Sequence, residues 1–419
     1  MHMTLKSSLP NPLAEAADIK KELNLKKLEL SALLEITQAI NNNLPEYALY
    51  KIYHFTLLAQ LHINRLTLFV VDDEWECKVC FGTSFNFKTL ETLPEAITNI
   101  SEITYLTDLN LDERWQEFET VIPVFQDNKL LAFVLIGNSQ AYYSNIAALS
   151  FVQTISNIII VAMQNRKLAR QRLAEESIRN EIKIAREVQT MLFPKSLPNN
   201  QEVAVHASYI PHSSIGGDYY DCVEIDQDQF LFCVADVSGK GVPASLLMSN
   251  FQAGLRTILR QTTDLVKVVK ELNYLIYKNA IAEKFITSFL GIFNRKTREL
   301  HYVNAGHNAP VMLYEDNSCH LLTEGSTMLG IFDELPFISL TTFQVPPKSI
   351  LLCYTDGLTE VFNQEEDEFG LDNTIDFLKR SRYMSLQKLH DELLEEIKQH
   401  NQGSTAFQDD ITLLSCRFK

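Results

Sequence analysis

One stretch of helix-forming sequence divides this chain into two parts. Residues 163–193 contain no glycine or proline, are rich in charged side chains, and are followed directly by Pro194. Proline lacks an amide donor and disfavours helical backbone in the residue before it, so a helix cannot continue past this point. The sequence therefore predicts a long helix between two globular units at residues 25–162 and 194–419, after a helical or flexible lead at residues 1–24.

Apolar residues along this predicted helix follow a three-and-four spacing. Ile178, Ile182, Ala185 and Leu192 lie on it, and Gln189 interrupts it. Such a pattern is typical of an imperfect coiled-coil seam, and it predicts a parallel dimer stalk. A solvated linker helix fits the same pattern, so the sequence leaves both interpretations open.

The composition excludes several classes of protein. Hydrophobic residues make up 46% and charged residues 21% of the chain, which is typical of a globular protein. Acidic residues number 53 against 37 basic ones, a net charge of -16, which argues against a nucleic-acid partner. The seven cysteines do not form a disulfide framework, so we expect a reducing, cytoplasmic setting. No apolar run approaches the roughly 20 residues of a membrane span, and none is expected.

The part before the long helix combines helical and strand patterns. The spacing of leucine and isoleucine predicts two helices over residues 18–60, with a break at Asn41–Asn43. The β-rich runs at residues 65–71 and 76–81 flank a polar turn and predict a hairpin, and a further strand is expected at residues 130–136.

This order of helices, hairpin, late strand and closing helix resembles that of a GAF sensor domain. The segments RLTLFVVDDEWECKVCFG and LLAFVLIGNS carry the resemblance best, whereas the signature of cyclic-nucleotide-binding GAF domains is not evident. The resemblance implies an α/β sensor for a small-molecule or protein signal. A dimerisation module without a ligand is the alternative.

Cys77 and Cys80 form a CxxC motif in the predicted hairpin. A zinc site would need a second cysteine pair or a nearby histidine, and the sequence offers neither. In a regular strand, a spacing of three places the two side chains on opposite faces of the sheet. A half-buried strand is therefore the preferred interpretation.

Acidic residues recur at the ends of strand-like runs in the C-terminal part. They lie in four segments, SIGGDYYD, FLFCVADVSGKG, ILLCYTDGLTE and FQDDITLLSCRF. In the second and third segments, glycine follows the aspartate directly or within three residues and lets the backbone turn sharply beside a bound group. Converging carboxylates would repel one another by about 4 kcal/mol per pair at a separation near 4 Å and an effective dielectric constant near 20. A cation is therefore expected among them.

The ligand chemistry indicates which cation this is. Oxygen ligands without clustered histidine or cysteine favour Mg²⁺ or Mn²⁺ over zinc or copper. Two such ions sharing a carboxylate can generate a bridging hydroxide, the usual device for hydrolysing phosphate esters. A single Asp-Gly pair is more often a surface turn, so it is the presence of four acidic segments in one domain that favours a metal site.

The order of the motifs in this part resembles the SpoIIE/RsbU branch of the metal-dependent (type 2C, PPM) serine/threonine protein phosphatases. The motifs lie between about residues 185 and 417 and are AREVQTMLFPKSLP, GGDYYD, ADVSGKGVPASLLMS, FITSFLGIFNRKTRELHYVNAGHNAP, YTDGLTEVFN, FG and DDITLL. The resemblance implies an α+β chain whose C-terminal unit is a β-sandwich of two antiparallel sheets flanked by helices. It also implies a binuclear Mn²⁺ or Mg²⁺ centre at one end of the sandwich.

Site residues follow from matching these motifs position by position. The match implies that Asp218 binds the metal pair directly or through water, that Asp236 bridges both ions, and that the Val237 carbonyl completes one of them. Asp356 and Asp409 would bind the other ion. The four aspartates would then be catalytic through a metal-bridged hydroxide that attacks phosphorus. Residues expected near the site are Asp410, Lys240, Gly217 and Gly239.

Three features beside these motifs need an interpretation. The eukaryotic relatives hold phosphate with an arginine shortly before the first acidic motif, and HASYIPHSSIGGD contains none. Lys240 could supply this charge, and an exposed loop lysine is an equally good interpretation.

His307 in NAGHNAP invites a general-acid role, but a turn stabilised by hydrogen bonds is preferred. The acidic run at residues 365–368 predicts a solvated loop, with a mobile flap as the alternative.

The resemblance also implies a biological role. The expected activity is dephosphorylation of a small signalling protein, such as an anti-sigma factor antagonist in a partner-switching pathway, by a homodimer that the GAF-like domain regulates. The alternative is a catalytically silent module of the same fold that binds a partner protein. GGDYY also looks similar to the GGDEF motif of diguanylate cyclases, but the other three acidic motifs have no place in that family. The four intact acidic segments favour the phosphatase.

Overall fold

The computed structural model of the chain describes residues 12–60, 62–72, 74–90, 92–109, 111–126, 128–137, 146–279, 284–403 and 407–419. The chain forms two compact units that divide between Glu175 and Glu176. Residues 1–11 of the predicted lead and Asp73 of the predicted hairpin turn lie outside the described residues.

The N-terminal unit is built on a five-stranded antiparallel sheet in the order β2-β1-β5-β4-β3. Its strands are β1 (Arg65–Val71), β2 (Trp75–Phe81), β3 (Thr104–Tyr105), β4 (Thr120–Gln126) and β5 (Lys129–Gly137). The hairpin β1-β2 and the strand β5 lie where the sequence patterns predict them. The GAF resemblance of this unit stays a prediction.

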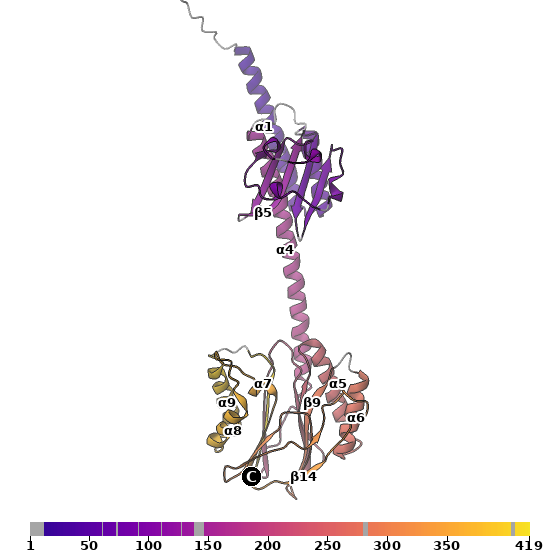
Figure 1. Cartoon of the computed structure of the whole chain (residues 1–419), viewed down its shortest axis with the longest axis vertical. Coiled ribbons are helices and arrows are strands. Elements are labelled where there is room, and N and C mark those ends of the chain that lie inside the picture. Colours follow the sequence, from indigo (N-terminus) through magenta and orange to yellow (C-terminus); the bar gives the residue numbers. More distant parts are fainter. Residues whose placement is uncertain are drawn as a thin grey trace, which may run out of the picture. The chain divides into compact units, whose positions relative to one another are not determined.

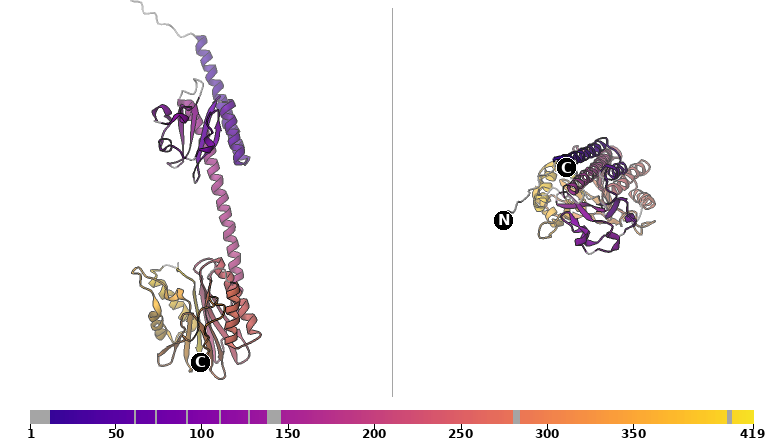
Figure 2. Two further views of the ribbon diagram at one scale, coloured as in Figure 1. Left: turned by 45° about the vertical axis from the view of Figure 1, so that its right-hand side comes forward. Right: turned by 90° about the horizontal axis from the view of Figure 1, so that it is seen from above.

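Helices cover one face of this sheet (Figures 1 and 2). They are α1 (Pro12–Asn41), α2 (Glu46–Phe55) with the π-helical turn η1 (Thr56–Gln60), and the first part of α4 (Ile146–Thr190). Their apolar residues, among them Ile36, Tyr53 and Ile155, are buried against the sheet. The Tyr53 hydroxyl lies 2.6 Å from the Ser156 hydroxyl and so joins α2 to α4.

Aromatic side chains cover the opposite face. Short helical turns carry several of them, namely η2 (Phe87–Thr89), α3 (Glu95–Thr98), η3 (Leu106–Asp108) and η4 (Glu113–Trp115). Phe87 and Trp115 pack with ring centroids 5.1 Å apart, and Phe69 stacks on Phe133 at 5.0 Å. Burial of such large apolar rings is the main stabilising contribution on this side of the sheet.

A β-bulge interrupts the pairing of β1 with β2. Phe69 pairs with Cys77 and Leu68 pairs with Val79, so Lys78 is an extra residue in β2. Cys77 and Cys80 consequently both pack against the aromatic face. The expectation that they lie on opposite faces of the sheet is therefore wrong, because the bulge shifts the alternation by one residue.

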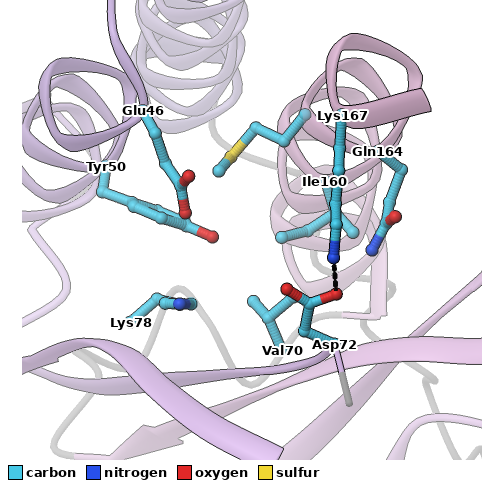
Figure 3. A pocket seen from close by; sticks show the side chains of 9 residues that line it. Glu46, Tyr50, Val70, Asp72, Lys78, Ile160, Gln164 and Lys167 are labelled. Carbon is cyan, nitrogen blue, oxygen red and sulfur yellow. Dashed lines mark hydrogen bonds and ion pairs between the residues drawn. The ribbon is translucent and has the colours of Figure 1, made fainter. Parts of the chain in front are cut away.

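A small cavity of about 60 Å³ lies between the sheet and helices α2 and α4 (Figure 3). Charged and polar side chains line much of it, including Glu46, Tyr50 and Lys78. Lys167 of α4 forms an ion pair with Asp72, directly after β1, at the same cavity.

Helix α4 is 45 residues long and belongs to both units. Its first turns, from Ile146, form the expected closing helix of the N-terminal unit and are part of its apolar core, and the helix continues through most of the predicted stalk to Thr190. Within residues 148–190 it contains a window of mean hydropathy 1.2 that is long and apolar enough to cross a membrane, and 39% of that window is buried. Val152 and Ile159 in this part are fully buried against the sheet, as in a core helix of a globular unit.

The C-terminal unit contains two facing sheets. The first has the order β13-β10-β9-β8-β7 with β14 also paired to β10, and the second has the order β12-β11-β15-β16-β6. The pairing is antiparallel except for the two-residue contact of β13 with β10. The strands are β6 (Val203–Ile210), β7 (Tyr219–Glu224), β8 (Gln229–Val237), β9 (Ile286–Asn294), β10 (Glu299–Ala305), β11 (Val311–Leu313), β12 (Cys319–Leu321), β13 (Gly325–Ser326), β14 (Thr341–Gln344), β15 (Ser349–Tyr354) and β16 (Ile411–Phe418).

Helices cover the outer faces of both sheets (Figure 1). Helices α5 (Val242–Leu259) and α6 (Leu265–Asn279) pack on the first sheet, and α8 (Gly370–Ser381) and α9 (Leu386–His400) pack on the second. Phenylalanine side chains of β8 and β9 fill the space between the sheets together with residues of β16. The predicted α+β sandwich of two sheets flanked by helices is confirmed.

Candidate functional site

The four acidic segments of the C-terminal unit meet where strands of both sheets end. Asp218 directly precedes β7, and Asp236 is the second-last residue of β8. Asp356 opens the short helix α7 (Asp356–Thr359) after β15, and Asp409 lies two residues before β16. Because β7 pairs with β8 and β15 pairs with β16, each sheet contributes two adjacent segments.

Asp218 occupies the buried centre of this group. Its carboxylate accepts hydrogen bonds from the hydroxyl groups of Thr355 at 2.8 Å and Thr412 at 2.6 Å. Thr355 directly follows β15 and Thr412 lies in β16, and both strands belong to the second sheet. The two hydrogen bonds therefore join Asp218, which precedes a strand of the first sheet, to the second sheet. Burial raises the pKa of Asp218 well above its usual value, and the neighbouring carboxylates of Asp236 and Asp410 add to the rise.

Asp236 lies beside this carboxylate and is also surrounded by negative charge. Burial raises its pKa to about 7, with further contributions from Asp356, Asp409 and Asp410, while a hydrogen bond with Asp218 opposes the rise. The pKa of Asp356 is raised in the same direction, first by burial and then by Asp409. These shifts mean that the fold brings together more negative charge than its own cations neutralise.

Asp410 fixes the backbone of the first acidic segment. One carboxylate oxygen accepts from the His212 amide at 2.7 Å, and the other accepts from the Gly217 amide at 2.7 Å. At Gly216 an added Cβ atom would lie 2.3 Å from this carboxylate and 2.1 Å from the Tyr209 hydroxyl, so the turn requires glycine. Both carboxylate oxygens of Asp410 are thus used by backbone amides, and the metal-binding role of Asp409 stays a prediction.

The glycines around Asp218 and Asp236 permit a close approach of backbone segments. A Cβ atom on Gly217 would lie 3.1 Å from the Val237 carbonyl oxygen, which places that carbonyl beside the turn. Gly239 has a φ of +89°, and a Cβ atom there would lie 2.1 Å from the Lys284 ammonium nitrogen. The Lys284 ammonium group donates to the Ser238 carbonyl at 3.0 Å.

Lys240 is the predicted source of positive charge, and it has a partner. Its ammonium nitrogen lies 2.9 Å from a carboxylate oxygen of Asp409, with both side chains about half exposed, and it also donates to the Gln408 carbonyl. An exposed ion pair of this kind contributes little stability, about 0–1 kcal/mol, so it can open at small cost. Lys240 lies at the site as expected, next to the most exposed aspartate of the group.

The sequence patterns did not reveal three further groups at this site. Glu360 follows Asp356 by four residues, and its pKa is raised by burial, Asp356, Glu368 and Asp409. Lys284 lies beside Gly239, although nothing in its sequence context indicates this. Gln189 near the end of α4 donates to the Gly216 carbonyl at 2.8 Å and is buried.

Gln189 therefore has a different role from the one its position in the helix suggested. It interrupts the predicted coiled-coil seam because its side chain is used inside the C-terminal unit. Phe193, just after the helix, packs against Tyr209 and Tyr220 with ring centroids 5.0 Å and 4.9 Å apart. The end of α4 is thus attached to the segment that carries Asp218.

His307 is buried and its environment does not favour a general acid. Its Nδ1 atom lies 2.9 Å from the Thr287 hydroxyl, and Asn304 binds its backbone carbonyl and amide at 3.0 Å and 2.7 Å. Burial lowers its pKa to about 4, so the imidazole is neutral at neutral pH. The hydrogen-bonded turn is the interpretation that agrees with these contacts. The acidic run at residues 365–368 is exposed, as a solvated loop would be.

The donor set fits hard divalent cations. Among the described residues, no three His, Cys, Asp or Glu side chains enclose a metal position by themselves. Mg²⁺ commonly retains several waters and takes only one or two carboxylates from the protein, so a site of separated carboxylates suits it. The raised pKa values of Asp218 and Asp236 are the observation that favours cations here, because a bound cation removes the repulsion that causes part of the rise.

This sandwich, with an acidic group at one end, has the fold of PP2C-type domains. The SiaA-PP2C domain of Pseudomonas aeruginosa superposes on 59% of this chain and 99% of its own length, with a TM-score of 0.52 and 20% sequence identity. The model of the family described as Stage II sporulation protein E (SpoIIE) matches residues 226–419. Residues 226–419 of this chain are therefore similar to the SpoIIE family. Asp236, Asp356 and Asp409 lie inside the matched residues, and Asp218 precedes them.

Curated relatives match parts of the chain at lower identity. Protein IcfG of Synechocystis sp. is 24% identical over 321 residues, which are 70% of this chain and 47% of that protein. Phosphoserine phosphatase RsbU of Bacillus subtilis is 28% identical over 239 residues, which are 57% of this chain and 64% of that protein. The chain thus spans about half to two thirds of the length of these relatives.

Proposed function

We propose that this chain is a metal-dependent protein phosphatase that hydrolyses phosphoserine or phosphothreonine in a protein substrate. The observation that carries the proposal is the convergence of Asp218, Asp236, Asp356 and Asp409 at one end of a PP2C-type sandwich. The matched family model and a relative named phosphoserine phosphatase support the same activity. PP2C-type phosphatases use Mg²⁺ or Mn²⁺.

The proposed centre is binuclear, and each residue has its own role in it. Asp218, Asp236 and the Val237 carbonyl would hold one ion, and Asp236, Asp356 and Asp409 would hold the other. The bound ions would activate water for attack on phosphorus and polarise the phosphoryl oxygens. Thr355 and Thr412 hold the Asp218 carboxylate in place with two hydrogen bonds. Asp410 has the same function for the backbone at Gly217.

Lys240 is the proposed phosphate-binding group in place of the missing arginine. It already pairs with a carboxylate at the site, at 2.9 Å from Asp409, and its side chain is about half exposed. If Asp409 held a cation, Lys240 would lose its carboxylate partner, and its ammonium group could turn from the Gln408 carbonyl to a substrate phosphate. A phosphate dianion at this position would also find Lys284 on the other side of Gly239.

The proposed substrate is a small phosphorylated signalling protein of the anti-sigma factor antagonist class, and the proposed setting is the cytoplasm. The match to the SpoIIE family model and the relative named RsbU support this choice. We also propose that the N-terminal unit is a GAF-like sensor and that the chain acts as a homodimer through α4. Ile178, Ile182 and Ala185 of the predicted seam are exposed or only partly buried, which leaves this face of α4 available to a second copy.

Regulation would act through the end of α4. Gln189 binds the Gly216 carbonyl, two residues before Asp218, so a shift of the helix changes the position of the first acidic segment. A signal can only favour one helix position if it binds the two positions with different affinity. The attachment of Phe193 to the aromatic rings of β6 and β7 gives the helix a defined active position.

The test is hydrolysis of p-nitrophenyl phosphate and of a phosphoserine peptide by the wild type and Asp236→Asn, with Mn²⁺, with Mg²⁺ and after chelation. We expect metal-dependent turnover in the wild type and a loss of at least about 10³-fold in the variant, since several kcal/mol of transition-state stabilisation is removed. Asp228→Asn is the matched control, because Asp228 is an exposed aspartate at the other end of β8. Full folding without turnover under any metal would instead favour a silent protein-binding module.

A further inference from the structure

The β-bulge in the N-terminal unit brings two cysteine side chains together. Cys77 pairs with Phe69 and Cys80 pairs with Thr67, so three residues of β2 span the length of two residues of β1. The two cysteines are therefore separated along the sheet by the rise of about two residues, or roughly 7 Å. Both side chains pack against the aromatic face and both are partly exposed.

The surroundings of the two thiols are unequal. The Cys80 sulfur lies 3.2 Å from the Thr83 hydroxyl, while the Cys77 thiol donates to the Val79 carbonyl at 3.4 Å. The neighbouring Cys77 contributes most to lowering the pKa of Cys80 to about 6, and Thr83, the Phe87 backbone and the charge of Lys88 add to the lowering against the effect of burial. The same contact and burial raise the pKa of Cys77. These contacts favour the thiolate at Cys80 over the thiolate at Cys77.

No other cysteine of the chain combines partial exposure, a lowered pKa and a neighbouring thiol. Cys233, Cys353 and Cys416 are buried in the C-terminal unit, and burial raises their pKa values. Cys222 and Cys319 are partly exposed, but burial raises their pKa values as well. A partly exposed thiolate with a second thiol beside it is typical of cysteines that peroxides oxidise reversibly.

We propose that Cys77 and Cys80 are a redox-active dithiol that a hydroperoxide converts to a disulfide. The Cys80 sulfur attacks one peroxide oxygen, the O–O bond breaks, and hydroxide leaves while Cys80 becomes a sulfenic acid. The Cys77 sulfur then attacks the Cys80 sulfur, the S–O bond breaks, and water leaves with the Cys77 proton. Two thiols and one hydrogen peroxide thus give one disulfide and two waters. Metal binding is disfavoured, because no third His, Cys, Asp or Glu joins the pair among the described residues.

Closing this disulfide would change the strand. Disulfides require Cα atoms about 4.4–6.8 Å apart, so a pair separated by roughly 7 Å must move closer and the bulge must tighten. Lys78, the extra residue of the bulge, lies between the two cysteines, and its side chain lines the cavity beside α2 and α4 (Figure 3). Oxidation on the aromatic face therefore moves a charged side chain on the helical face.

The experiment uses the full chain, treated at pH 7 with a few equivalents of hydrogen peroxide and then with iodoacetamide. Trypsin cuts after Lys78, so the disulfide appears as a cross-link between peptides 66–78 and 79–88 in the unreduced digest. Cys77→Ser should stop at a sulfenic acid on Cys80, which dimedone traps in peptide 79–88. Cys80→Ser should abolish both products. Cys319→Ser is the control and should give the wild-type cross-link.

Two rate measurements separate a reactive thiolate from a thiol that is merely accessible. In the untreated wild type, iodoacetamide should modify Cys80 at pH 7 about tenfold faster than Cys319, because the larger thiolate fraction outweighs its lower nucleophilicity. Thr83→Val should reduce the rate at Cys80 severalfold, since the Thr83 hydroxyl, 3.2 Å from the sulfur, can turn from the Phe85 carbonyl to donate to the thiolate. Equal rates at Cys80 and Cys319, or peroxide oxidation of Cys77 that is unchanged in a folded Cys80→Ser variant, would overturn the proposal.

Discussion

Two buried aspartates, only three residues apart in the C-terminal unit, have opposite environments. Asp221 in β7 accepts hydrogen bonds from Arg256 of α5 at 2.8 Å and 2.9 Å, from the Tyr219 hydroxyl at 2.6 Å and from the Cys222 amide at 2.8 Å. Asp218 accepts from two threonine hydroxyls, and its charged neighbours are the carboxylates of Asp236 and Asp410.

The difference between them distinguishes structural charge from functional charge. The charge of a buried carboxylate that is paired with an arginine is neutralised within the chain. Here the pair holds α5 against β7. A buried carboxylate among other carboxylates raises the energy of the folded chain, at about 4 kcal/mol per pair near 4 Å for an effective dielectric constant near 20. Protonation or a cation from outside the chain removes that cost, and this supports the proposed metal site at Asp218.

The largest effect that tests this comparison concerns folding in the absence of metal. Arg256→Met should lower the free energy of unfolding by about 3 kcal/mol, because it leaves the Asp221 carboxylate buried without a cation. Asp236→Asn in the same chelating buffer should leave stability unchanged or raise it by about 1 kcal/mol, because a repelling charge is lost.

Hydrogen exchange of the β7 and β8 amides is the suitable measurement, since both tryptophans lie in the N-terminal unit and fluorescence would not report on these strands. A destabilisation by Asp236→Asn as large as that by Arg256→Met would show that the acidic group is compensated within the chain. Asp228→Asn, at the exposed turn between β7 and β8, should change neither.

A buried histidine extends the comparison of buried ionisable groups, because its protonation makes the stability of the chain depend on pH. His390 of α9 lies between the hydroxyl groups of Ser208 at 2.9 Å and Ser415 at 2.8 Å, and burial lowers its pKa to about 3. The unfolded chain binds a proton at this residue near pH 6.5 and the folded chain does not, so stability is lost as the pH falls from about 6.5 toward 3.

The matched variant is His390→Gln, which removes the titrating group and retains hydrogen bonding. Between pH 7 and pH 5 the wild type should lose about 2 kcal/mol more unfolding free energy than the variant. Urea unfolding followed by circular dichroism at the two pH values gives this difference. Equal losses in both proteins would mean that His390 titrates normally in the folded state.

The smallest predicted effect concerns the hydrogen bond that attaches α4 to the acidic segment. Gln189→Leu removes the donor to the Gly216 carbonyl and should lower kcat for p-nitrophenyl phosphate about tenfold, the equivalent of roughly 1.4 kcal/mol. The exposed neighbour Val188→Ala is the control and should retain the wild-type rate. An unchanged rate in Gln189→Leu at all Mn²⁺ concentrations would mean that Asp410 and the threonines position Asp218 without help from the helix.

The secondary structure and the positions of the acidic residues could be predicted from sequence because both depend on local patterns. The hairpin of residues 65–81 follows from β-rich runs around a polar turn, and α4 ends at Thr190, shortly before Pro194. The four acidic segments could be read as strand ends because apolar runs lead into or out of them. The sandwich itself required the resemblance to a known family.

Other features could not be predicted because they depend on contacts between distant segments. The Gln189 side chain reaches a carbonyl 27 residues away, and in the sequence it is only a polar interruption of a seam. Asp410 and Asp409 are neighbours with equal chemistry, and only the tertiary structure turns one toward the Gly217 amide and the other toward Lys240.

The sequence by itself determined where helices and strands begin and end and which segments carry carboxylates, since proline, glycine and apolar periodicity act over a few residues. The tertiary structure decided which aspartate is neutralised by an arginine and which faces other carboxylates. It also placed Cys77 and Cys80 on one face, because a single extra residue in strand pairing reverses the alternation that the sequence alone predicts. Register and long-range charge pairing are properties of the packed chain, and no local pattern encodes them.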